Sequence, residues 1–232
     1  MFRSVSVGFS KPDELIFAQD SGTGRTGASM GSMLGWTLGI GASVAALVLV
    51  AALKLQNADL AYVHMAIAAC VSIAMAFAAV RELRQPELAA NPELLASAGS
   101  RYLGVIWTWG ALALIVTYAF VLQWREWWHF SLVFIALAGA CLFLSATLRK
   151  DAESGADDDT MFKLARILIR IHFGAAILTV IGLLVDGKMV RFLVPRHHDW
   201  AAQNIFFFGA IALGIVSWHT LVAMKAAQPA KG

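Results

Sequence analysis

Four of the six histidines in this 232-residue chain fall near the same end of its apolar segments. They are His64, His129, His197 and His198. Neutral imidazole is a good ligand for Zn²⁺, Cu²⁺ and haem iron, so a shared depth in a membrane would favour a metal or haem site. Histidine also suits the half-wet boundary of a bilayer, as Trp and Tyr do, and we favour this simpler interpretation.

The other two histidines, His172 and His219, lie deeper in apolar segments. His172 follows Lys163, and His219 precedes Lys225, and these two lysines flank the apolar segments. At a helical rise of 1.5 Å per residue, the histidines lie about 14 and 9 Å from those lysines. If the two segments are neighbours, a haem b could bind between these side chains, or a quinone could hydrogen-bond to one of them. The interpretation we favour is a histidine that is hydrogen-bonded to a Ser, a Thr or a backbone carbonyl on the next helix.

One arginine, Arg170, is the only charged residue well inside an apolar segment, and Arg166 precedes it by one helical turn. A long guanidinium side chain at that depth can extend to the lipid headgroups, which is the simpler interpretation. The functional alternative is a site for an anion or an anionic lipid, formed by Lys163, Arg166 and Arg170 on one helix.

A small residue recurs at every fourth position near the N-terminus, at Gly27, Gly31, Gly35, Gly39 and Ser43. This spacing keeps the small residues on one helix face, where another helix can approach closely. The stripe predicts helix packing, either within the chain or between two copies of it.

The residues above belong to or flank six apolar segments, each long enough to cross the hydrocarbon core of a bilayer, which is about 30 Å thick. The predicted spans are residues 33–53, 60–80, 102–122, 130–148, 164–185 and 205–224. We therefore expect an all-α polytopic integral membrane protein. Its parts are an N-terminal segment (1–32), a six-helix transmembrane domain (33–226) and a C-terminal tail (227–232).

The connections and the charges predict how these spans are arranged. Short connections favour three antiparallel hairpins, because neighbouring spans must then reverse direction. Most of the 18 Lys and Arg residues fall on the side that holds both chain ends. Since basic residues are retained in the cytoplasm, both termini are expected there, and we expect a multi-pass protein of the cytoplasmic (inner) membrane.

The composition excludes several classes of function. Hydrophobic residues make up 59% of the chain, charged residues only 14%, and the mean hydropathy is +0.69. A soluble domain cannot bury so much apolar surface, so we expect the protein to lie in a lipid bilayer. The basic residues are scattered, which argues against a nucleic-acid partner. No Asp or Glu lies inside a predicted span, which argues against a carboxylate proton relay.

These observations favour a non-enzymatic membrane protein that acts by helix packing. It would be an accessory or assembly subunit of a membrane complex, or a homo-oligomer, so its partners would be other membrane subunits or further copies of itself. One alternative is a haem- or metal-handling redox protein that uses the membrane histidines. The other is a transporter of a small solute or anion with Arg170 at its site.

Overall fold

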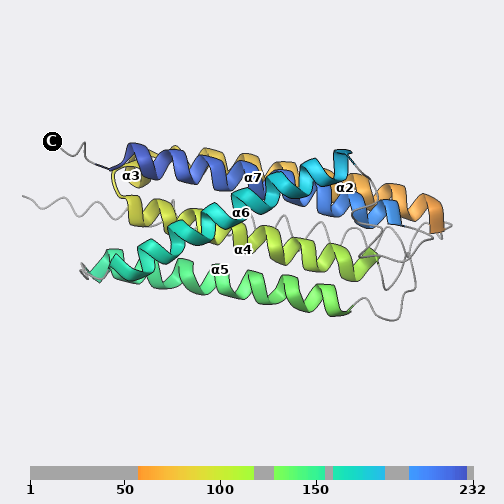
Figure 1. The fold of residues 1–232 in the computed structure, drawn as a ribbon, viewed down its shortest axis with the longest axis horizontal. Helices are drawn as coiled ribbons and strands as arrows, with labels where there is room; N and C mark the ends of the chain where they lie inside the picture. Colours follow the sequence, from red (N-terminus) through yellow and green to blue (C-terminus); the bar gives the residue numbers. More distant parts are fainter. Residues whose placement is uncertain (1–56, 118–127, 155–158, 186–198, 229–232) are drawn as a thin grey trace, which may run out of the picture.

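The computed structural model describes residues 57–117, 128–154, 159–185 and 199–228, and every element in these ranges is a helix (Figure 1). The elements are α2 (Asn57–Leu83), α3 (Pro86–Ala89), α4 (Pro92–Val116), α5 (Trp128–Ser154), α6 (Asp159–Val185) and α7 (Asp199–Ala226). The predicted span 33–53 and the small-residue stripe from Gly27 to Ser43 lie outside the described residues.

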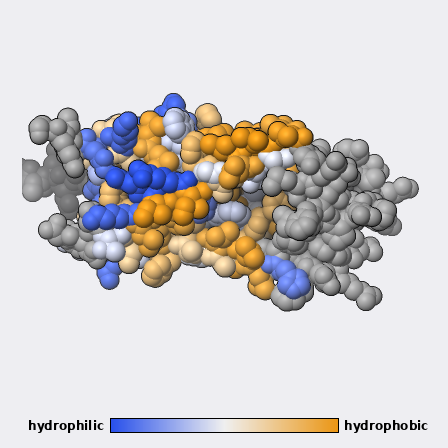
Figure 2. Space-filling model, in the orientation of Figure 1, coloured by the Kyte–Doolittle hydropathy of each residue, from blue (hydrophilic) through white to orange (hydrophobic). Residues whose placement is uncertain are grey.

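Five of these helices are long and apolar enough to cross a membrane. The qualifying stretches are Ala66–Leu83, Pro92–Val116, Ser131–Ser154, Thr160–Val185 and Ile205–Ala226. Large apolar side chains point outward from several of them, including Phe77, Phe143 and Leu178. Figure 2 shows this apolar surface, with hydrophilic side chains gathered at the end where α6 begins. An outward-facing apolar surface of this kind is typical of a multi-pass membrane protein.

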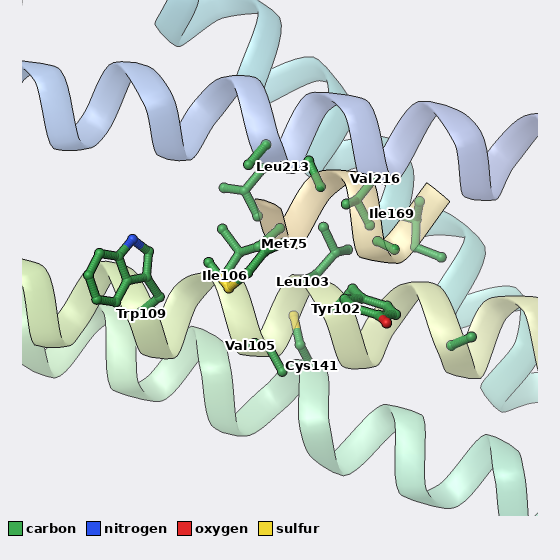
Figure 3. Packing of buried hydrophobic residues seen from close by; sticks show 14 of the residues in the cluster. Met75, Tyr102, Leu103, Val105, Ile106, Trp109, Cys141, Ile169, Leu213 and Val216 are labelled. Atoms are coloured by element: carbon green, nitrogen blue, oxygen red, sulfur yellow. The ribbon is translucent and has the colours of Figure 1, made fainter. Parts of the chain in front are cut away.

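Helix α4 lies at the centre of the bundle and contacts α2, α5, α6 and α7. Two thirds of its residues are buried, whereas α6 buries only 17% of its membrane stretch. Figure 3 shows the core that results, in which Leu103 and Ile106 of α4 lie among Met75, Leu213 and Val216. Helix α4 provides much of this core and holds α5, whereas α2 and α6 pack mainly against α7.

Helix α4 begins ten residues before the predicted span at residue 102. The side chain of Asn91 caps it by accepting hydrogen bonds from the backbone N–H groups of Glu93 (2.8 Å) and Leu94 (3.2 Å). Pro92 occupies the first helical position, where a missing N–H costs nothing. Residues 95–100 are all buried, although their small and polar side chains lower the local hydropathy. A span predicted from hydropathy alone therefore begins later in the sequence than the helix does.

Small residues in the first half of α4 allow its neighbours to approach closely. A Cβ added to Gly99 would lie 2.4 Å from the Thr220 methyl carbon on α7, and a Cβ on Gly104 would lie 2.7 Å from Leu142 on α5. Ser97 and Ser145 each donate a hydrogen bond of 2.8 Å to the other's backbone carbonyl, which joins α4 to α5. Small residues and hydroxyl groups are the usual means of packing helices in lipid.

Helix α6 crosses the bundle obliquely (Figure 1). Its packing against α7 is extensive, and its contact with α5 is slight. The C-terminal ends of α2, α5 and α7 lie at the same end of the bundle as the start of α6 (Figure 1). That end therefore collects Arg81, Arg149, Lys150, Lys163 and Lys225, and we refer to it as the basic end.

Candidate functional site

The buried histidine of α6, His172, contacts two other helices. Its Nδ1 lies 2.8 Å from the backbone carbonyl oxygen of Leu168, one turn earlier in α6. Trp107 of α4 donates its indole N–H to His172 Nε2 at 2.9 Å. Because Nε2 accepts, the ring proton is placed on Nδ1, where it is donated to Leu168. Cys141 Sγ of α5 lies 3.8 Å from the same Nε2 atom.

His172 is hydrogen-bonded, as the favoured interpretation expects, but the carbonyl it contacts belongs to its own helix rather than to the next one. Trp107 as the second partner was not predicted, because it is 65 residues away in the chain. His219 is half-buried on α7. Both ring nitrogens of His172 already have partners, so a metal or haem bound there would have to displace Trp107 or the Leu168 carbonyl.

Aromatic rings surround the Trp107–His172 pair. Trp107 and Phe134 of α5 meet edge to face, with ring centroids 4.7 Å apart. Phe134 meets Phe206 of α7 in the same manner at 5.6 Å. Edge-to-face contacts suit aromatic quadrupoles, so these rings hold one another in fixed orientations. They form one wall of a hollow in the bundle.

The hollow is a cavity of about 280 Å³ between α4, α5, α6 and α7. His172, Trp107, Phe134 and Phe206 line it together with small residues, among them Ala176 and Gly209. Its surface is mainly apolar, and its polar side chains are those of Trp107, His172 and Thr179. The Thr179 hydroxyl donates to the Ala175 carbonyl of its own helix at 2.8 Å. An apolar cavity with a few convergent polar groups is the usual form of a small-molecule site.

A second polar cluster lies nearer the basic end, between α2 and α4. Glu82 is only 4% exposed, and its carboxylate accepts a hydrogen bond of 2.6 Å from the Tyr102 hydroxyl. Its other oxygen pairs with the Arg101 guanidinium. Glu82 lies beyond the predicted span 60–80, but α2 continues to Leu83 and carries the carboxylate into the packed interior.

The remaining predicted site residues are spread over the molecule. His129 is exposed in the first turn of α5, and Lys163 and Arg170 are exposed on α6, where Arg166 is half-buried. His64 belongs to α2, but its side chain is outside the described part, as are His197 and His198 altogether. Within the described ranges, no three His, Cys, Asp or Glu side chains are grouped as a metal site requires. The proposed outer histidine cluster therefore stays a prediction.

No family model, curated protein or solved structure matches the chain. What the cavity and the polar clusters do is therefore inferred from their own residues.

Proposed function

We propose that this protein is a non-enzymatic, multi-span protein of the cytoplasmic membrane that binds a small, planar, apolar molecule from the bilayer. The observation that carries the proposal is the α4–α7 cavity, with its aromatic wall and its interhelical hydrogen bond between Trp107 and His172. A molecule with the chemistry of a quinone headgroup fits these features best.

The wall residues explain this choice of ligand. Trp107, Phe134 and Phe206 offer ring faces and edges to a flat, unsaturated molecule. The indole N–H of Trp107 donates to His172, and a carbonyl oxygen of a ligand could replace His172 as its acceptor. The indole N–H would then keep an acceptor, and His172 Nε2 would keep Cys141 Sγ at 3.8 Å as its neighbour, whereas a charged ligand would be left without a counter-charge.

The position of the cavity provides a route from the lipid. Ala175, which lines the cavity, is exposed, and α5 and α6 are only slightly in contact in the described part of the chain. An apolar molecule dissolved in the membrane would reach the cavity between these two helices without passing through water. The role we infer is that of holding or presenting the molecule, for a partner subunit or a neighbouring enzyme.

Filling the cavity tests this proposal. Gly209 lines the cavity, and an added Cβ would meet nothing within 4 Å among the described residues, so Gly209→Leu adds a bulky side chain at the cavity wall from an unobstructed Cβ. We expect purified Gly209→Leu to lose binding of a short-chain benzoquinone, measured by equilibrium binding in mild detergent. Gly174→Leu on α6 is the matched control, because its position is also open but does not line the cavity. Equal binding by the two variants would contradict the proposal.

A second candidate function is the assembly of a complex through helix packing. Ala136, Gly139 and Ala140 on α5 are exposed, and a Cβ on Gly139 would meet nothing described within 4 Å. A small-residue face that the described helices leave uncovered favours a further helix. We expect Gly139→Ile to reduce the oligomeric mass measured by light scattering, with Gly174→Ile as the control. A monomeric wild-type protein in mild detergent would argue against self-association.

A further inference from the structure

A basic groove lies between α6 and α7, away from the cavity. It is about 810 Å³ in volume and open on one side, and three cationic side chains line it. Arg166 and Arg170 come from α6 and Lys225 from the last turn of α7. Arg170 and His172 point about 200° apart around α6, so the groove and the cavity use different faces of that helix. Figure 2 shows hydrophilic side chains that reach from the basic end into the apolar surface.

The three cations have no counter-charge in the part of the chain that the structure describes. The two ion pairs found there are Arg101–Glu82 and Arg149–Glu153, and neither involves a residue of the groove. Arg166 lies over the Phe162 ring, with its guanidinium carbon 5.0 Å from the ring centroid. Arg166 and Arg170 are four residues apart on one helix, where like charges repel. An anion between them would remove this repulsion.

The groove also has an apolar half. Trp218, Leu221 and Val222 of α7 line it beside the cations. Trp218 is half-exposed and stacks on Phe173 of α6, with ring centroids 5.4 Å apart. A free phosphate ion would contact only the cationic half. A phospholipid would use both halves, with its phosphate on the cations and an acyl chain along the apolar wall.

We propose that this groove binds an anionic phospholipid from the leaflet at the basic end. The phosphate lies between Arg166, Arg170 and Lys225, and the first part of an acyl chain lies along Trp218 and Val222. Guanidinium groups suit this role, because their planar N–H donors match the oxygens of a phosphate. Lys163, which the sequence groups with Arg166 and Arg170, does not line the groove, and Lys225 from α7 takes its place.

The test compares lipids of equal chain length on the full-length protein in mild detergent. Native mass spectrometry would count the phosphatidylglycerol and phosphatidylcholine molecules that stay bound. We expect phosphatidylglycerol to be retained in preference, and Arg170→Gln to weaken its binding about fivefold, as for the loss of one cation near a membrane surface. Lys150→Gln removes an exposed cation at the same end, outside the groove, and should leave binding within about twofold.

Three outcomes would overturn the proposal. One is equal weakening by Lys150→Gln and Arg170→Gln, which would indicate a diffuse surface charge. Another is equal retention of phosphatidylcholine and phosphatidylglycerol. The last is displacement of the lipid by millimolar inorganic phosphate, which would make the groove a phosphate-ion site. If Arg170→Gln fails to fold, Lys225→Gln can be used instead, because it removes an exposed cation at the end of α7. We expect it to weaken phosphatidylglycerol binding to the same degree.

Discussion

At the scale of single residues, Glu82 has the most demanding surroundings in the described part of the protein. A carboxylate withdrawn from water is stable only when it is paired and hydrogen-bonded. Here one oxygen pairs with Arg101, and the other accepts from Tyr102. Since Arg101 and Tyr102 both belong to α4, the carboxylate joins the end of α2 to the centre of the bundle.

We expect Glu82→Gln to destabilise the protein by about 2 kcal/mol, because it leaves the partly buried Arg101 without a counter-charge. For a chain of this size that corresponds to a fall of about 4–8 °C in the apparent Tm, measured by thermal unfolding in detergent. Glu153→Gln, which removes one partner of the exposed Arg149 pair, should change the Tm by less than about 2 °C. A similar Tm for the two variants would show that the Glu82 pair does not hold α2 in place.

The candidate site shows how far single residues could be predicted. The depth and residue type of His172 indicated that it would lie in the interior. Trp107 and Cys141 come from helices far away in the sequence, and which helix face meets which depends on packing between them. No local spacing reports such contacts, so the cavity and its aromatic wall could not be predicted.

At the scale of elements, the position of α4 follows from the size of its residues. Gly99 meets Thr220 of α7, and Gly104 meets Leu142 of α5. Thr220 is fully buried, and its hydroxyl donates to the Val216 carbonyl at 2.7 Å, so it cannot easily move aside. The first half of α4 is therefore fitted tightly between two neighbours.

Gly99→Ala should accordingly destabilise the bundle by about 1–3 kcal/mol, the usual cost of overpacking. The control is Gly174→Ala on α6, where the new methyl group meets nothing described within 4 Å. That change should be neutral or stabilising by up to about 1 kcal/mol, because Ala favours a helix more than Gly does. Equal effects of the two substitutions on the apparent Tm would contradict close packing at Gly99.

The predicted spans from residue 60 onward fall on described helices, except for 118–122, which lie outside the described residues. About 20 apolar residues in lipid can satisfy their backbone only as a helix. The start of α4 was predicted less well. Ser97, Gly99 and Ser100 lower the hydropathy of its first turns, yet they are buried between helices rather than exposed in a loop. Hydropathy measures the preference for lipid, and it cannot identify small residues that face another helix.

At the scale of the whole molecule, the uneven distribution of charge predicts the orientation. The basic end holds the C-terminal ends of α2, α5 and α7, and basic residues are retained in the cytoplasm. A fluorescent protein fused after Gly232 should therefore be fluorescent, and alkaline phosphatase fused at the same point should be inactive. The opposite pair of results would invert the proposed orientation. A fusion in the 118–127 connection should behave in the reverse way.

Because Cys141 is buried, the reactivity of its thiol can report when the helix bundle opens. Cys141 is fully buried against His172, whereas Cys70 on α2 is exposed (Figure 3 shows Cys141). In a Cys70→Ser background, a membrane-permeant thiol reagent can reach Cys141 only when α4, α5 and α6 separate. The alkylation rate of this thiol therefore measures how often the helices part. A molecule that occupies the neighbouring cavity should slow it.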